Sequence, residues 1–196
     1  MSVTVWSRAA MRVALVALLA AALVPLHPAP ASAATWVVST TSRTESEIRA
    51  RWEALKPVDD GTPYAVTPSV VAPYAAGIAA TAFVDDGLRM LNFGRYLAGL
   101  PADVTTTSAL HNQAQHGAVL LAASTFSHTP PKPADMDQAF YDLALSSTTS
   151  SNIGSGYTDA ESFQAACLDD ASTSTIARVG HRRWLLNPPM KLTGIG

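Results

Sequence analysis

The sequence has little charge, few aromatic residues and almost no cysteine, and each shortage excludes a class of protein. Of its 196 residues, 14% are charged, 7% are aromatic and one, Cys167, is cysteine. A single cysteine excludes an internal disulfide, so stability depends on packing or on a ligand. Thirteen Lys and Arg stand against 15 Asp and Glu without a basic cluster. Nucleic acid and anionic lipid are therefore poor electrostatic partners for the chain as a whole.

Long apolar runs are also missing after residue 33, where no stretch approaches the ~18 residues of a membrane helix. Before it, Arg8 and Arg12 precede an apolar run over 13–24, and the small residues 31–33 follow. This order is typical of a secretory signal peptide. The run is too short, at ~1.5 Å per residue, to cross a ~30 Å hydrocarbon core. We predict that residues 1–33 are a signal peptide and that the mature chain is secreted, extracellular and without a transmembrane segment.

The mature chain divides into an N-terminal extension, residues 34–82, and a domain, residues 83–196. Without the signal peptide its net charge is −4, from 11 Lys and Arg against 15 Asp and Glu. In the extension, residues 36–38 favour a short strand and residues 44–55 a short helix. Prolines then recur every five or six residues, so residues 57–80 are predicted to be an extended segment lying against the domain.

Capping residues and apolar spacing predict four helices in the domain. They run from Asp85 or Asp86 to about Ala98, from Thr106 or Thr107 to about Ser124, from Asp137 to Leu145, and from Asp159 to about Asp170. The connections are rich in Pro, Ser, Thr and Gly, and loops held by a helical frame often carry binding chemistry. Residues 190–196 read as the start of a strand. It either pairs with an earlier segment or belongs to a truncated domain, and we favour truncation.

Polar side chains fall on the buried face of the first and fourth helices. In the first, Asn92 and Arg95 share a face with Leu88 and Leu91. Either Asn92 caps a loop and Arg95 reaches solvent, or both brace a polar cleft. In the fourth, the apolar face is continued by Asp170.

Asp170 therefore points inward, whereas Asp169 lies ~100° round the helix toward solvent. A buried carboxylate needs a cation, a metal ion or a proton, and His181 is the nearest candidate in the sequence. Cys167, on the same apolar face, is predicted to be a buried core thiol.

The four histidines of the mature chain fall into two groups. His111 and His116 are five residues apart on one helix, ~140° round its axis, so they cannot chelate one ion and are predicted to be surface residues. His128 and His181 lie in or beside loops. With Asp170 they could form a three-ligand metal site with an open position. The alternative is an Asp170–His181 ion pair that orients the loop.

Several segments together resemble the CAP superfamily, which includes cysteine-rich secretory proteins, plant pathogenesis-related proteins and bacterial SCP-like extracellular proteins. They are Asn92-Phe93-Gly94-Arg95, Ala109–Ala123, Ser127-His128, Ser151-Asn152-Ile153 and Gly180-His181-Arg182-Arg183. The continuation from Arg182 to Pro188 is similar to bacterial members. The resemblance implies an α+β fold, an α-β-α sandwich that is mostly helical here, with its last strands missing.

The resemblance also implies a cleft with two histidines and two acids, which in some members binds a divalent metal such as zinc. These positions fall on His128, His181 and Asp170, while Ser151 stands where the second acid would be. Asn152 and Arg95 are expected to brace the cleft. Serine does not replace a carboxylate as a ligand or base at pH 7 without activation.

Two functions follow as hypotheses. The first is a secreted binding module, not an enzyme, whose cleft takes a divalent metal, a lipid, a cell-wall polymer or a protein. The second is a metal-dependent hydrolase of peptide or cell-wall substrates, in which zinc would activate water. No GxSxG, HExxH, phosphate-loop or dinucleotide motif is present, and the sequence offers no general base for the hydrolase.

Overall fold

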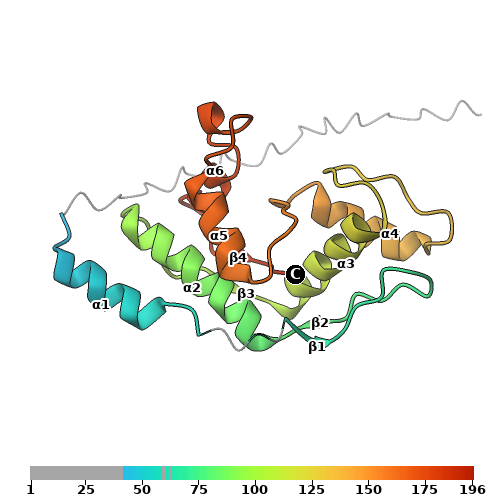
Figure 1. Ribbon diagram of the computed structural model, residues 1–196, viewed down its shortest axis with the longest axis horizontal. Helices are drawn as coiled ribbons and strands as arrows, with labels where there is room; N and C mark the ends of the chain where they lie inside the picture. Colours follow the sequence, from blue (N-terminus) through green and yellow to red (C-terminus); the bar gives the residue numbers. More distant parts are fainter. Residues whose placement is uncertain (1–41, 59–60, 62) are drawn as a thin grey trace, which may run out of the picture. The chain divides into compact units, whose positions relative to one another are not determined.

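Polar caps set most of the helix starts in the computed structural model, which describes residues 42–58, 61 and 63–196 (Figure 1). In each case a side-chain oxygen of the capping residue accepts a backbone N–H from the first turn. The helices are α1 (Glu45–Leu55) after Thr44, α3 (Ser108–Ala123) after Thr107, α4 (Gln138–Thr148) after Asp137, and α5 (Ala160–Asp169) after Asp159. These four predictions are confirmed, with α4 three residues longer than expected.

Helix α2 (Thr81–Leu97) begins earlier than predicted, and neither Asp85 nor Asp86 caps it. Its N-cap, Ala80, makes no side-chain hydrogen bond. Asp86 instead lies buried one turn into the helix, where it accepts the Val58 N–H at 2.9 Å and contacts Arg89 at 3.2 Å. Asp86 was a predicted cap because Asp is common at helix N-termini. Its carboxylate instead holds the segment around Val58 against α2.

The strands of the described residues form two separate two-stranded sheets. β1 (Tyr64–Val66) pairs antiparallel with β2 (Ile78–Ala79), and β3 (Thr105–Thr106) pairs parallel with β4 (Leu192–Thr193). The class is α+β, as predicted, and helices make up the larger part of the regular structure. The strand near residue 192 thus pairs with an earlier segment. The full α-β-α sandwich stays a prediction.

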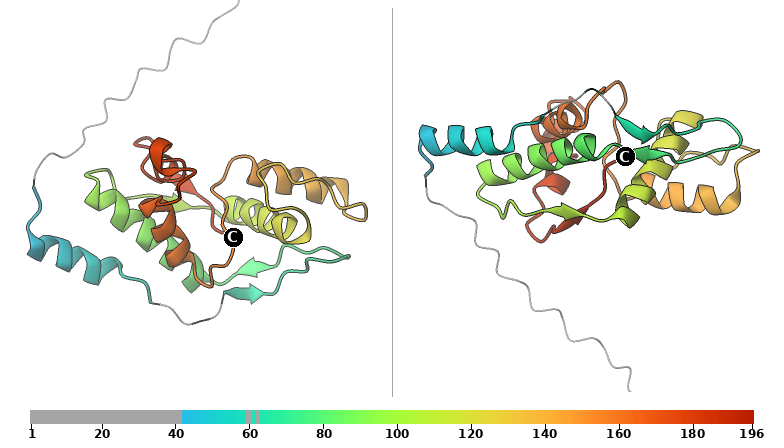
Figure 2. Two further views of the ribbon diagram at one scale, coloured as in Figure 1. Left: turned by 45° about the horizontal axis from the view of Figure 1, so that its top comes forward. Right: turned by 90° about the horizontal axis from the view of Figure 1, so that it is seen from below.

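Two helix pairs carry the packing of the domain. α2 packs against α5, and α3 packs against α4 (Figures 1 and 2). Leu91, Cys167 and Leu185 form the core beneath α5, and Leu120 and Ala144 belong to the core between α3 and α4. The burial of Cys167 confirms the core thiol, and this burial, with a smaller effect from Asp170, raises its pKa to about 12.

The last strand runs close to α3. Gly194 follows β4, and a β-carbon at this position would lie 2.3 Å from the Leu110 carbonyl oxygen. Only glycine allows the backbone of this segment to approach the helix so closely. His111, on the same helix, forms hydrogen bonds with the backbone of Ile195.

The extension packs on the domain through aromatic and polar contacts. Trp52 of α1 lies with its ring centroid 5.1 Å from that of Phe93, and the Tyr74 hydroxyl donates to Asp135 at 2.9 Å. The predicted signal peptide and the strand at residues 36–38 lie outside the described residues. Within residues 42–58, 61 and 63–196, no helix combines the length and apolar character needed to cross a bilayer.

Candidate functional site

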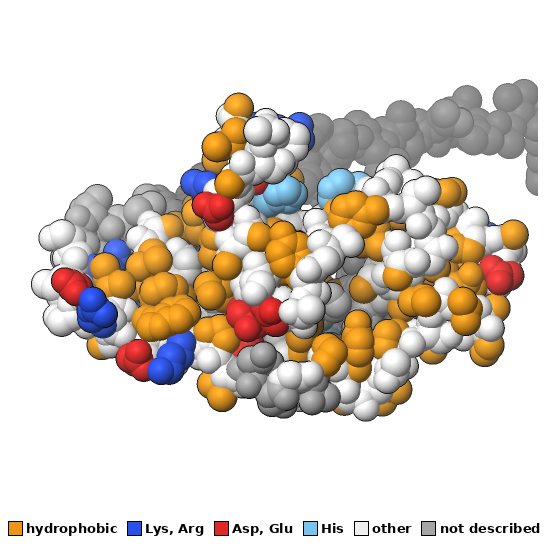
Figure 3. All heavy atoms as spheres, in the orientation of Figure 1, with side chains coloured by type: hydrophobic (Ala, Val, Ile, Leu, Met, Phe, Trp, Pro, Cys, Tyr) orange, Lys and Arg blue, Asp and Glu red, His pale blue; other side chains and the backbone are white. Residues whose placement is uncertain are grey.

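The described residues form a cleft of about 980 Å³. One side is made by α3 and the loop after α4. The other side is made by α5, α6 (Arg182–Leu185) and the segment before β4. Four of the predicted site residues line the cleft: His128, Ser151, Asn152 and His181. Asp170 and Arg95 are not among its lining residues. Histidine side chains show on the face drawn in Figure 3, with charged side chains at several places on the same face.

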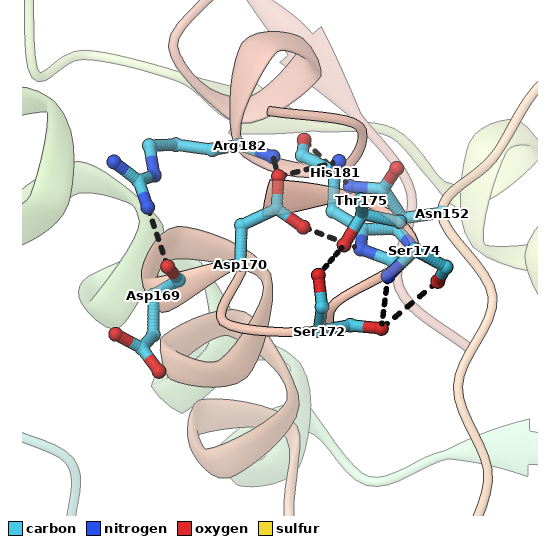
Figure 4. Close-up of polar contacts among 8 residues, drawn as sticks. All are labelled: Asn152, Asp169, Asp170, Ser172, Ser174, Thr175, His181 and Arg182. Carbon is cyan, nitrogen blue, oxygen red and sulfur yellow. Dashed lines mark hydrogen bonds and ion pairs between the residues drawn. The ribbon is translucent and has the colours of Figure 1, made fainter. Parts of the chain in front are cut away.

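The His181 imidazole is held in one orientation by Asp170. The ring nitrogen Nδ1 lies 2.9 Å from Asp170 Oδ1 (Figure 4). The backbone carbonyl oxygen of His181 accepts a hydrogen bond from the Asn152 side-chain amide at 3.2 Å. Asp170 is ionised at neutral pH, as its lowered pKa shows, and an ionised carboxylate only accepts hydrogen bonds. Nδ1 therefore carries a proton, and among the described residues Nε2 has no hydrogen-bond partner.

Asp170 follows the last residue of α5 in a left-handed conformation, with φ 47° and ψ 38°. It is 2% exposed and accepts the His181 N–H at 3.0 Å and the Arg182 N–H at 3.3 Å. Burial raises the pKa of this carboxyl, but hydrogen bonds from the Thr175 hydroxyl, the Arg182 amide and His181 outweigh burial and lower the pKa to about 2. The inward orientation expected from the helix phase is thus what the structure contains.

The His128 imidazole is held in the same manner by a backbone carbonyl. Its Nδ1 lies 2.7 Å from the Thr148 oxygen, and the Thr148 hydroxyl donates back to the His128 oxygen at 3.0 Å. A carbonyl oxygen accepts and never donates, so Nδ1 again carries the proton. His128 and His181 therefore contribute two imidazoles to one cleft, and within the described residues neither Nε2 has a protein partner.

The residues present do not fit a metal centre built from three or four protein ligands. In the part of the chain that the structure describes, no group of three or more His, Cys, Asp or Glu side chains is placed to hold a metal ion. Both oxygens of Asp170 are already used by backbone and side-chain donors. Ser151 brings a neutral hydroxyl where the resemblance implies an acid. The structure contains the alternative to the three-ligand site, an Asp170–His181 pair.

Arg95 does not line the cleft itself, but it binds the backbone of residues that do, Leu185 and Asn187. Its side chain is fully buried, against the alternative that it reaches solvent. The guanidinium donates to the carbonyl oxygens of Leu185 at 2.8 Å and Asn187 at 2.9 Å, and more weakly to Pro188 and Met190. Burial lowers the Arg95 pKa. Asn92 caps a loop, as one alternative predicted, because its amide pairs with both the N–H and the oxygen of Val104.

The other two histidines lie outside the lining of the cleft. His116 bonds to the Asn112 oxygen at 2.7 Å and stacks against Phe140. His111 is half-buried, and its Nε2 lies 2.6 Å from the Thr106 hydroxyl. The prediction of a surface residue is therefore wrong for His111, because its ring joins α3 to β3 and to the segment after β4.

Most lining residues were not predicted as site residues, among them Arg178, Arg183 and Trp184. Trp184 is 55% exposed, and the Arg183 guanidinium carbon lies 4.9 Å from the centroid of its ring. Arg183 and Trp184 belong to the motif that follows His181, which could have identified them. No sequence motif marks Arg178 as a site residue, because the path of the loop over residues 171–180 brings it to the cleft.

Comparison with protein-family models, with curated proteins and with solved structures found no match. The CAP resemblance therefore rests on the motifs of the sequence and enters below as part of a proposal.

Proposed function

We propose that this chain is a secreted CAP-type binding module that holds a hydroxyl-rich saccharide, such as a cell-wall polymer, in the cleft between α3 and α5. The proposal combines the signal-peptide pattern of residues 1–33 with the lining of the cleft. Hydroxyl and amide side chains dominate the polar part of this lining, including Ser151, Asn152 and Gln164. Such groups both donate to and accept from sugar hydroxyls.

One observation carries the proposal: His128 and His181 line the same cleft with Nδ1 fixed and Nε2 available. Each Nε2 can accept a hydrogen bond from a ligand hydroxyl, and little orientational freedom is lost because the rings are already held. Fixing a binding group before the ligand arrives lowers the cost of association. The exposed ring of Trp184 offers an apolar surface with a polar edge at the same cleft.

The lining combines apolar side chains such as Phe163 and Met190 with hydroxyl and amide groups. We propose a saccharide and not a lipid because the hydroxyl and amide groups can pair with sugar hydroxyls. The metal-dependent hydrolase is the second hypothesis, but no observation favours it over binding. Its donor set lacks a third protein ligand among the described residues, and no side chain has been identified as its general base. We therefore derive no catalytic step.

Co-sedimentation of the mature protein with insoluble cell-wall polysaccharide tests the proposal. The double variant His128→Asn/His181→Asn removes both Nε2 acceptors, whereas each Asn amide can still donate to Thr148 or Asp170. We expect the wild type to sediment with the polymer and the double variant to lose about tenfold in affinity.

The matched control is His116→Asn, the same change outside the cleft, and it should bind as the wild type does. Thermal midpoints of all three proteins check that they are folded. Equal binding by the wild type and the double variant, or no binding by either, contradicts the proposal. Release of soluble fragments with zinc chloride, abolished by a chelator, would support the hydrolase instead.

A further inference from the structure

We infer that the saccharide bound in this cleft is anionic, carrying carboxylate or phosphate groups that Arg178 and Arg183 recognise. This inference rests on the proposed function and adds the charge of the ligand to it. It departs from the expectation drawn from the net charge of the whole chain, because it concerns the local charge of one cleft.

The cleft has no acidic lining, although the sequence has more acids than bases. Its charged lining residues are Arg178 and Arg183, and none of its described lining residues is Asp or Glu. The buried anion nearby, Asp170, lies behind His181, and its oxygens accept hydrogen bonds from protein groups. A concave surface lined by one sign of charge concentrates ligands of the opposite sign.

The two arginines have no carboxylate partner among the described residues. Salt bridges elsewhere join Arg49, Lys56, Arg89 and Lys191 to acids at 2.5–3.2 Å. By contrast, Arg178 and Arg183 are both exposed, and within the described ranges neither lies within 4.0 Å of a carboxylate. A guanidinium without a carboxylate partner keeps its N–H donors for a ligand.

The backbone around each arginine is fixed, so the charges are held at the cleft. Arg178 ends a short 3-10 turn whose N–H groups donate to Ser172 and Thr175, and Thr175 is itself buried beside Asp170. Arg183 lies in α6, directly after the residue whose N–H Asp170 accepts. One buried carboxylate therefore anchors both segments that carry the cations (Figure 4).

The planar guanidinium binds carboxylate and phosphate oxygens through paired N–H donors. A saccharide chain that carries such groups would place hydroxyls against His128 and His181 and negative charges against Arg178 and Arg183. Uronic acids and phosphodiester-linked polyols share this chemistry, so the experiment includes a chain of each kind.

The test measures affinity for three soluble chains: neutral dextran, polygalacturonate and a polyglycerol phosphate. The variant is Arg178→Gln/Arg183→Gln, and the control Arg43→Gln/Arg49→Gln makes the same change of charge outside the lining of the cleft. We expect the wild type to bind a polyanion at least about tenfold more tightly than dextran, and high salt to weaken this binding. The cleft variant should lose that preference, and the control should keep it.

The outcomes separate the two proposals. Equal affinity for dextran and both polyanions, or a cleft variant that binds polyanions like the wild type, overturns the anionic ligand and leaves the proposed function standing. Failure to bind any of the chains or the cell-wall polymer overturns both. Tighter binding to vesicles of anionic phospholipid than to either polyanion also overturns the inference. Tight binding to polygalacturonate alone identifies the carboxylate as the recognised group, and tight binding to polyglycerol phosphate alone identifies the phosphate. Either result supports the inference.

Discussion

Arg95 and Asp170 are buried charges of opposite sign, and each must be stabilised away from water. Arg95 is stabilised by hydrogen-bond acceptors and Asp170 by hydrogen-bond donors. Arg95 is surrounded by carbonyl oxygens of residues 101 and 185–190, and Asp170 by N–H and O–H donors of residues 175–182. In both cases most partners are uncharged groups fixed by the fold. A buried ion can be stabilised by several oriented dipoles as well as by a counter-ion.

The two charges differ in what they position. Arg95 binds the end of α6 and the turn that follows it, residues 185–190, and is not among the lining residues of the cleft. Asp170 fixes a side chain, His181, that does reach it. Loss of Arg95 should therefore damage the fold, whereas loss of Asp170 should damage the site together with a part of the stability.

The largest expected effect is that of Arg95→Met. The substitution keeps apolar volume but removes the guanidinium donor from the carbonyl oxygen of Leu185 and one of the two donors to the oxygen of Asn187. We expect a loss of more than about 3 kcal/mol in the free energy of unfolding, measured with urea. The control Arg49→Met removes an exposed ion pair of α1 and should cost less than about 0.5 kcal/mol. Similar small losses in both variants would show that the buried guanidinium does not hold residues 185–190.

Asp170→Asn should have a smaller effect on stability and a specific effect on its pH dependence. The pKa of this carboxyl is lowered from 3.8 to about 2, so its stabilisation is present above pH 3.8 and is lost as the pH falls through 2. The variant should melt at a lower temperature than the wild type at pH 6, and the difference should shrink toward pH 2.

Asp169→Asn is the matched control, because Arg182 binds the carbonyl oxygen of Asp169 and not its exposed carboxylate. Its melting temperature should follow that of the wild type at every pH. Thermal melting followed by circular dichroism from pH 6 to pH 2 makes the comparison. A constant difference between Asp170→Asn and the wild type across this range contradicts the account of Asp170.

The smallest effect concerns Cys167, which lies between the two charged regions in the core with Leu91 and Leu185. Its thiol is buried and its pKa is raised to about 12, so the reactive thiolate is scarce at pH 8. A thiol reagent should leave the native protein unlabelled and modify one thiol after unfolding in urea. Rapid labelling of the native protein would show that the core beneath α5 opens easily.

Local signals predicted the parts of the fold that depend on neighbouring residues. Thr107, Asp137 and Asp159 satisfy backbone N–H groups two or three positions ahead, so their helices could be located from the sequence alone. The inward phase of Asp170 followed from the spacing of α5 in the same way. Asp86 was misjudged because its partners include Val58, 28 residues earlier.

The site required contacts that no local pattern contains. His128 meets Thr148 across 20 residues, and Arg95 meets Leu185 across 90. The sequence therefore suggested that Arg95 braces a cleft or reaches solvent, without showing which carbonyls it binds. Arg178 depends on the path of residues 171–180, and this path is set by Thr175 and Asp170 together.

Gly194 has a consequence for any attempt to remodel the cleft. It is one of the residues that line the cleft, and its backbone touches α3 so closely that no larger residue has room without moving the Leu110 carbonyl. A library that randomises residues 190–194 and is screened for folded protein should return glycine at position 194, while residues 190–193 diversify. The depth of the cleft is then invariant, and engineered selectivity has to come from the rim.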